Sequence, residues 1–242
     1  MRQNIKKLSI VIPCYNEEGT IELILEDVDE VQLDKIKKEI IIIDDYSSDN
    51  TRKILKRLSK TRKDLKVIYQ PKNQGKGAAL KVGFTHSTGD LVVVQDADRE
   101  YDPRDYKRMV DIFLEDRADI VFGSRFSSGA PRRVVYLMNT IANKLMTRLS
   151  AVLSGLYVTD IHTCYIMFDG DWIRTKAKHL RSKRFGFNPE IVAKIAREKE
   201  DLKICEVGIS YYGRTKKEGK KIGYRDGISA IGQIIKYNIL FR

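Results

Sequence analysis

The first half of the chain alternates short apolar runs with longer segments whose apolar residues recur every three or four positions. The runs are rich in Val and Ile, and we predict from them buried strands at residues 8–15, 38–45, 65–71, 90–98 and 118–126. Between them, segments such as 17–31 place Ile21, Leu25 and Val28 on one helical face. Strands that alternate with helices predict an α/β fold with a mainly parallel, doubly wound sheet and helices on both faces.

The second half has a different pattern. Residues 134–157 are apolar but contain Lys144 and Arg148, which is typical of an amphipathic helix rather than of a membrane span. The last stretch, 226–242, places isoleucines at helical spacing. Residues 206–227, between these segments, are basic and predict a hairpin-like region.

Polar clusters follow four of the predicted strands, at the point where each strand ends. These clusters are CYNEE after the first strand, DDYSSDN after the second, DADRE after the fourth and GSRF after the fifth. In open parallel sheets, ligands bind in the crevice beyond the carboxyl ends of the strands. We therefore expect the four clusters to form one site.

Three carboxylates, Asp96, Asp98 and Glu100, follow the fourth strand at alternate positions. Carboxylates that share a crevice repel each other, and a hard divalent cation relieves that repulsion. Mg²⁺ or Mn²⁺ binds carboxylate oxygens and keeps places for phosphate oxygens, so these residues predict a metal site for a diphosphate. The alternative is that they cap the next helix and are solvated in a loop.

Other motifs narrow the ligand. There is no GxGxxG after the first strand, which argues against a dinucleotide-binding dehydrogenase, and the GKG turn at 75–77 lacks the spacing of a P-loop. Lys76 in this turn is either a phosphate contact or a solvated turn residue. Asp44 and Asp45 fit contact with a nucleotide better than they fit a second metal pair.

Composition indicates the charge of the binding partner and the cellular compartment. The 242 residues include 45 Lys and Arg against 33 Asp and Glu, a net charge of +12, which indicates an anionic partner or only a basic proteome. The three cysteines contain no CxxC pair, which favours reduced thiols in a cytosolic protein. The N-terminal apolar run is too short for a signal peptide, and no apolar stretch is long enough to span a membrane.

Several motifs in this order and spacing resemble glycosyltransferase family 2, which has the Rossmann-like GT-A fold. They are VIPCYNEE, IIIDDYSSDNT, NQGKGAAL, VVVQDADREYDP and FGSRF, and they cover about the first 130 residues. The second half, with DIHTCYIMF, RFGFNPEIVAKIA and the basic segment, is similar to the polyprenyl-phosphate hexose synthases, the dolichyl-phosphate mannose and glucose synthase group. The resemblance implies one continuous catalytic domain, in which residues 1–130 bind a nucleotide sugar and residues 131–242 bind the acceptor at a membrane surface.

The resemblance also implies roles for single residues. Those that hold the UDP- or GDP-sugar, or lie near it, would be Pro13, Tyr15, Glu17, Asp44, Asp45 and Lys76. Asp96 and Asp98 would carry the metal-bound diphosphate. Two positions depart from many relatives: Glu100, which remains a good metal ligand, stands where Gln is common, and Tyr46 stands where Gly is common.

The implied reaction transfers a hexose from the nucleotide diphosphate to a polyprenyl phosphate, with inversion at the anomeric carbon. A phosphate acceptor is already anionic near neutral pH, so it needs no general base, but cations must bring two anions together. The residues expected to carry catalysis or to bind the acceptor are Asp98, Arg125, Arg214, Lys221 and one of Arg132 and Arg133.

Contact with an anionic membrane surface would explain both the positive charge and the two apolar helices. We expect a protein that is peripherally associated with the cytoplasmic face of the membrane, alone or through a membrane-protein partner. The alternative for both helices is packing on the sheet or in a dimer.

Two other functions are compatible with the sequence. A family 2 enzyme that acts on a hydroxyl of a glycan or protein would need a general base, and Asp160 or Glu190 would be the candidates. A basic nucleic-acid-binding module is the alternative of another class. The chain has no recognised reading motif for it, so we expect no nucleic-acid partner.

Overall fold

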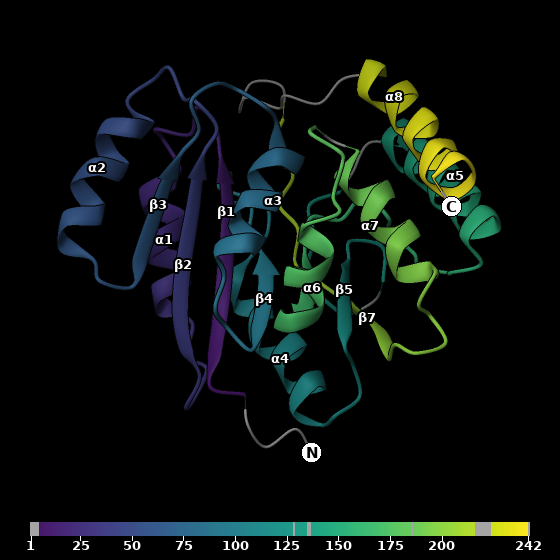
Figure 1. The fold of residues 1–242 in the computed structure, drawn as a ribbon, viewed down its shortest axis with the longest axis horizontal. Coiled ribbons are helices and arrows are strands. Elements are labelled where there is room, and N and C mark those ends of the chain that lie inside the picture. Colours follow the sequence, from purple (N-terminus) through teal and green to yellow (C-terminus); the bar gives the residue numbers. More distant parts are fainter. Residues whose placement is uncertain (1–4, 128, 135–136, 185, 216–223, 242) are drawn as a thin grey trace.

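The computed structural model describes residues 5–127, 129–134, 137–184, 186–215 and 224–241, and for residues 224–228 it describes the backbone alone. Across this part of the chain, one sheet has seven strands in the order β3-β2-β1-β4-β6-β5-β7 (Figure 1). The strands are β1 (Lys7–Cys14), β2 (Lys37–Asp44), β3 (Leu65–Tyr69), β4 (Leu91–Val94), β5 (Ile120–Ser124), β6 (Ile166–Asp169) and β7 (Ile204–Gly208). The strands predicted in the first half are all present, although β4 ends at Val94, before the carboxylates.

Helices alternate with the strands, as the sequence pattern predicts. They are α1 (Ile21–Glu30), α2 (Thr51–Thr61), α3 (Lys76–His86), η1 (Pro103–Asp105), α4 (Tyr106–Leu114), α5 (Leu137–Ser154), α6 (Gly170–Ala177), α7 (Phe187–Ala196), α8 (Tyr224–Ile235) and the π-helix η2 (Lys236–Leu240). Figure 1 shows α3 and α6 in front of the sheet and α1 behind it.

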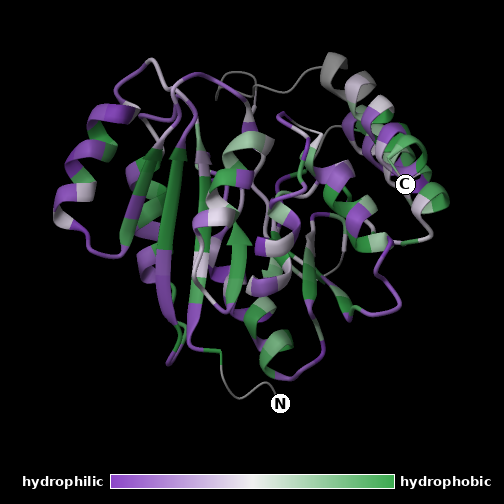
Figure 2. Ribbon diagram, in the orientation of Figure 1, coloured by the Kyte–Doolittle hydropathy of each residue, from purple (hydrophilic) through white to green (hydrophobic). Residues whose placement is uncertain are grey.

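Alternate residues of the central strands pack on opposite faces of the sheet. Leu8, Ile10 and Ile12 of β1 lie in one core with the apolar side chains of α1 and α4. Val11 lies in the other core, with those of α3, α6 and α7. Figure 2 shows the central strands in green, the colour of hydrophobic residues, as expected for strands covered on both faces. The prediction of a doubly wound α/β sheet is confirmed.

The second half of the chain completes the same sheet. β6 lies antiparallel between β4 and β5, and β7 runs parallel to β5 at the edge. The first part of the hairpin predicted over 206–227 is wrong, because β7 pairs in parallel with the edge strand β5. Further along, Tyr211 forms isolated β-bridges with Tyr101 and Arg132. Residues 216–223 of that segment lie outside the described part of the chain.

The polar clusters gather at one edge of the sheet. β1 runs parallel to β2 and β4, and both β4 and β5 are antiparallel to β6, so these four strands end at the same edge. This is the upper edge in Figure 1. The expectation that the four clusters lie at one edge of the sheet is therefore confirmed, and we call the space beyond this edge the crevice.

Helix α5 packs Met146, Leu149 and Leu153 against the core and exposes Lys144 and Arg148, as an amphipathic helix does, but its most buried positions are not apolar. Its buried residues are polar: Asn143, Thr147 and Ser150. Other apolar side chains project to solvent, with Leu137 72% exposed and Val152 81% exposed. Helix α8 packs beside α5 (Figure 1). None of the described helices combines the length and hydropathy that a membrane-spanning segment needs.

Candidate active site

The two aspartates at the end of β2 face different partners. Asp44 is fully buried and accepts a hydrogen bond from Nε of Arg52 at 2.6 Å. The carboxylate of Asp45 accepts the backbone N–H groups of Gln74 and Gly75, each at 2.7 Å. Burial raises the pKa of Asp45, and these donors oppose the shift. Asp45 thus fixes the glycine turn that begins α3.

Tyr46 has the backbone conformation that glycine adopts most easily, with φ at +66°. Its ring centroid lies 5.1 Å from the guanidinium carbon of Arg52, and the ring of Tyr69 lies 5.4 Å from the same carbon. Such cation–π contacts stabilise the loop after β2. The loop therefore keeps a left-handed backbone at position 46, although this chain has Tyr where the resemblance implies Gly.

Lys76, the first residue of α3, reaches across the crevice to the loop after β4. Its ammonium contacts the carboxylate of Asp96 and lies 2.7 Å from Sγ of Cys164. Burial alone would lower the pKa of Lys76, but its contacts with Asp96 and Cys164 together outweigh burial and raise that pKa. Burial also raises the pKa of the Cys164 thiol to about 12. The pair is therefore an ammonium beside a carboxylate, with a protonated thiol next to them.

Arg214 joins the loops after three strands. It follows β7, and its guanidinium lies 3.1 Å from Oε1 of Glu17, after β1, and 3.0 Å from Oδ2 of Asp98, after β4. Its backbone N–H donates to Oε1 of Glu100 at 2.7 Å, while the hydroxyl of Tyr211 donates to Oε2 at 2.8 Å. The predicted site residues Glu17, Asp98 and Arg214 are thus brought together.

All three carboxylates predicted to bind a metal ion have protein partners in this structure. Burial and the neighbouring charges of Asp96 and Glu100 raise the pKa of Asp98 to about 6, as expected where carboxylates crowd. The carboxylate chemistry of Asp96 and Asp98 suits a hard cation that keeps places for phosphate oxygens. In this structure, however, Asp96 contacts Lys76, and Asp98 accepts the backbone N–H of Glu100 at 3.2 Å through Oδ1 while its Oδ2 lies 3.0 Å from Arg214. Both oxygens of Glu100 are engaged by Tyr211 and Arg214. Over the described ranges, no group of three His, Cys, Asp or Glu residues is arranged to hold a metal. The ligand roles of Asp96, Asp98 and Glu100 stay predictions.

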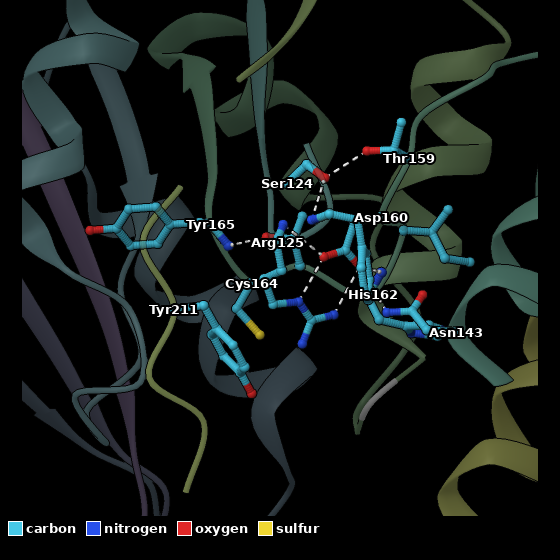
Figure 3. Close-up of polar contacts among 12 residues, drawn as sticks. Ser124, Arg125, Asn143, Thr159, Asp160, His162, Cys164, Tyr165 and Tyr211 are labelled. Carbon is cyan, nitrogen blue, oxygen red and sulfur yellow. Dashed lines mark hydrogen bonds and ion pairs between the residues drawn. The ribbon is translucent and has the colours of Figure 1, made fainter. Parts of the chain in front are cut away.

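Arg125, after β5, is held in a buried ion pair with Asp160 (Figure 3). Its Nε and terminal nitrogen donate to the two carboxylate oxygens at 2.7 and 2.8 Å, and Asn143 of α5 adds a bond of 3.0 Å. Burial of Asp160 would raise its pKa, but Arg125 outweighs it and lowers that pKa. The ring centroid of Tyr211 lies 5.1 Å from the guanidinium carbon. This bidentate geometry fixes the orientation of Arg125.

His162 lies beside this ion pair as a neutral imidazole. Burial lowers its pKa to about 4, against the attraction of Asp160. Its Nε2 is buried, and within the described part of the chain it has no hydrogen-bond partner. The imidazole is therefore uncharged near neutral pH.

The remaining predicted residues lie around the crevice or outside the description. Pro13 is in β1 opposite Ile43, and Tyr15 after that strand is 40% exposed. Arg133 donates to the carbonyl of Gly213 at 3.1 Å, next to Arg214. Lys221 lies outside the described residues.

Two contacts of this site were not foreseen from the sequence. The sequence indicates Asp160 as a candidate general base and gives no sign that it pairs with Arg125, as it does in the structure. Tyr211 was not singled out, although it contacts both Glu100 and Arg125. The only signal for Tyr211 is a pair of tyrosines shortly before Arg214.

Comparison with known proteins places the chain in a family. The family model "Glycosyl transferase family 2" matches residues 9–174. The chain is 28% identical over 219 residues to a UDP-N-acetylglucosamine–dolichyl-phosphate N-acetylglucosaminyltransferase of Methanococcus voltae, covering 84% of this chain and 85% of that protein. It is 24% identical over 249 residues to a dolichyl-phosphate beta-glucosyltransferase of Trichomonas vaginalis, covering 97% and 74%. A dolichol-phosphate mannosyltransferase of Pyrococcus furiosus is 33% identical over 123 residues, 51% of this chain and 34% of that protein.

Among solved structures, the fold matches glucosyl-3-phosphoglycerate synthase from Mycobacterium tuberculosis, in complex with Mn²⁺, UDP and phosphoglyceric acid. The TM-score is 0.70 at 18% identity, covering 97% of this chain and 79% of that one. This likeness confirms the GT-A fold. Since the family model spans more than half of the chain, the protein belongs to glycosyl transferase family 2 and is a glycosyltransferase.

Proposed function

We propose that this enzyme transfers a hexose, with inversion, from a UDP- or GDP-hexose to a polyprenyl phosphate of the dolichyl type. The observation that carries the proposal is the Arg214 network, in which one guanidinium contacts both Glu17 and Asp98. Lys76 contacts Asp96 alongside it. Two cations therefore lie beside the two aspartates. A site that binds a diphosphate and a phosphate together needs such cations to offset the repulsion between the two anions. The names of the three relatives, all dolichyl-phosphate or dolichol-phosphate transferases, support the acceptor.

The donor is proposed to lie against the loops after β1, β2 and β4. The residues proposed for it are Pro13, Tyr15, Glu17, Asp44, Asp45, Lys76, Asp96 and Asp98. Asp96 and Asp98, with Glu100 as a third ligand, would hold Mg²⁺ or Mn²⁺, which would supply positive charge against the leaving diphosphate. Lys76 and Arg214 then supply further positive charge to the diphosphate oxygens.

The acceptor phosphate is proposed to meet Arg125, Arg133 and Arg214, with Lys221 from outside the described residues. The carboxylates considered as bases for a hydroxyl acceptor are already engaged. Asp160 is fully buried and paired with Arg125. Glu190 is 1% exposed and accepts the backbone N–H groups of residues 181 and 182. This weighs against an acceptor that needs its proton removed.

The division of the chain is proposed to follow its two substrates, with 1–130 for the donor and 131–242 for the acceptor. The exposed apolar side chains of α5 support a lipid surface for the second half, because they would otherwise face water. We place the enzyme at the cytoplasmic face of an anionic membrane, peripherally bound, alone or with a membrane-protein partner.

A transfer assay tests this function. The enzyme is given a short polyprenyl phosphate, Mg²⁺ or Mn²⁺, and a panel of UDP- and GDP-hexoses that includes UDP-N-acetylglucosamine. We expect one donor to yield a lipid-linked sugar. Asp98→Asn should lower kcat/KM by about 100- to 1,000-fold, because the cation that would stabilise the leaving diphosphate loses a carboxylate ligand. The exposed Asp111→Asn on α4 is the matched control and should retain activity. Donor turnover that yields only free sugar would contradict the acceptor, and no turnover by folded enzyme would contradict the function.

A further inference from the structure

A second cavity, of about 440 Å³, lies apart from the crevice, between the loop after α6, helix α7 and η2. It shares no lining residue with the candidate active site. Figure 1 shows α7 and α8 next to each other at the end of the molecule away from α2. The cations that line the cavity are Lys81, Lys178, Arg181, Lys194 and Arg197.

Glu190 is the only carboxylate among the described residues that line this cavity. Its oxygens accept the backbone N–H of Arg181 at 2.9 Å and that of Ser182 at 2.7 Å. The ammonium of Lys194 lies 3.9 Å from it, at the limit of an ion pair. Glu190 therefore holds the wall of the cavity and compensates at most one of the five cations.

Neutral groups hold several of these cations in place. Lys81 donates to the carbonyl of Leu180 at 2.9 Å, and Arg197 donates to the carbonyl of Tyr237 at 2.5 Å. The guanidinium carbon of Arg181 lies 4.6 Å from the ring centroid of Phe241. Because carbonyls and a ring fix these groups without cancelling their charge, the cavity keeps a strong positive potential.

The electrostatics of Lys194 agree with this excess of charge. Its burial and the repulsion from Arg197 and Arg181 lower its pKa, although Glu190 attracts it. Cations that repel one another in a partly dry cavity are stabilised when an anion enters.

We propose that this cavity binds a phosphate group, which enters between Arg181, Lys194 and Arg197. Guanidinium and ammonium groups are the usual protein ligands of phosphate. The phosphate group could belong either to the headgroup of an anionic phospholipid or to a soluble phosphate, which have the same chemistry. The rim fits the headgroup, because Leu240 beside the cavity is 73% exposed and Ile239 is 53% exposed. This site does not depend on the transfer reaction proposed above.

The test measures binding of inorganic phosphate in one arm and of vesicles in the other. The ring of His179 lines the cavity and gives a local NMR signal for phosphate, separate from His162 in the crevice. The vesicles contain phosphatidylcholine with or without phosphatidylglycerol, and binding is measured by flotation. The test variant is Arg181→Gln with Lys194→Gln. The charge-matched control is Lys53→Gln with Lys56→Gln on α2, another basic surface.

We expect the cavity variant to weaken binding about thirtyfold in at least one arm, and the α2 control to change it less than about twofold. A loss confined to phosphatidylglycerol vesicles supports a headgroup, and a loss confined to inorganic phosphate supports a soluble ligand. Equal losses in both double variants, or no loss in either arm, would overturn the site. If the double variant does not fold, Arg181→Gln alone is used, because this side chain is exposed, and it must still weaken binding. The charge-conserving variant Arg181→Lys with Lys194→Arg must retain binding.

Discussion

The two sides of the crevice hold their charges in different ways. In the Arg214 network the side chains of Arg214 and Asp98 are 18% and 21% exposed, and one guanidinium is shared between two carboxylates. In the Arg125–Asp160 pair the carboxylate has no exposure, and both of its oxygens bind the same guanidinium. A shared, part-exposed cation can exchange a carboxylate for a ligand, whereas a sealed bidentate pair keeps its geometry. The first arrangement suits a cation that can exchange its partner when substrate arrives and leaves, and the second suits a cation held in one orientation for the acceptor phosphate.

Removal of the sealed carboxylate should have the largest effect on stability. Asp160→Asn leaves the Arg125 guanidinium partly buried without its counter-charge, and we expect the free energy of unfolding to fall by about 4 kcal/mol. Urea unfolding measures this change. The matched control is Asp171→Asn, whose carboxylate is 96% exposed and whose ion pair should contribute little. A loss below about 1 kcal/mol would mean that the pair does not hold Arg125 as we describe.

Removal of the shared guanidinium should act mainly on the reaction. Arg214→Gln frees Glu17 and Asp98 from their common partner, and we expect kcat/KM for transfer to fall by about 100-fold. Steady-state kinetics with both substrates measure it, with Arg104→Gln as the control at a surface pair. Because the network is part-exposed, the unfolding free energy should change by less than for Asp160→Asn. If Arg214→Gln lowered the unfolding free energy more than Asp160→Asn does, the distinction between the shared and the sealed charge network would be wrong.

His162 should make the sealed side sensitive to acid. Its pKa is about 4 in the folded protein, below the usual value of 6.5, so the unfolded chain binds the proton more readily. Stability from this group is therefore present above pH 6.5 and is lost as the pH falls from 6.5 towards 4. Between pH 7 and pH 5 the loss amounts to about 2 kcal/mol. The free energy of unfolding is measured at pH 7 and pH 5 for the unchanged protein and for His162→Gln. The decrease from pH 7 to pH 5 should be about 2 kcal/mol smaller in the variant. Parallel pH curves would disprove the assignment.

The first half of the fold was predictable because its signals are local. Each strand is a continuous apolar run, and the crevice residues follow the run directly, so one topological rule brings Asp45, Asp96 and Arg125 to the same edge. The backbone of Tyr46 shows a limit of this reasoning. The missing glycine identified an unusual loop, but the stacking of Arg52 on Tyr46 depends on side chains from two elements.

The charge pairs of the second half were beyond local reasoning. Arg125 and Asp160 are separated by 35 positions, and Glu17 and Arg214 by 197. No periodicity connects such residues, because their contact exists only after β6 and β7 have joined the sheet. The antiparallel strand β6 was not predicted from the sequence either.

The central claim is that Arg125 serves the acceptor and not the donor, and substitution by lysine tests it most directly. Arg125→Lys keeps the charge beside Asp160 but loses the bidentate fork. With Arg117→Lys as a surface control, the measurement compares the affinity for UDP with the KM for polyprenyl phosphate. We predict that UDP affinity stays within about twofold while the KM for polyprenyl phosphate rises about tenfold. A loss of UDP affinity as large as the change in acceptor KM would contradict the division of the crevice between its two substrates.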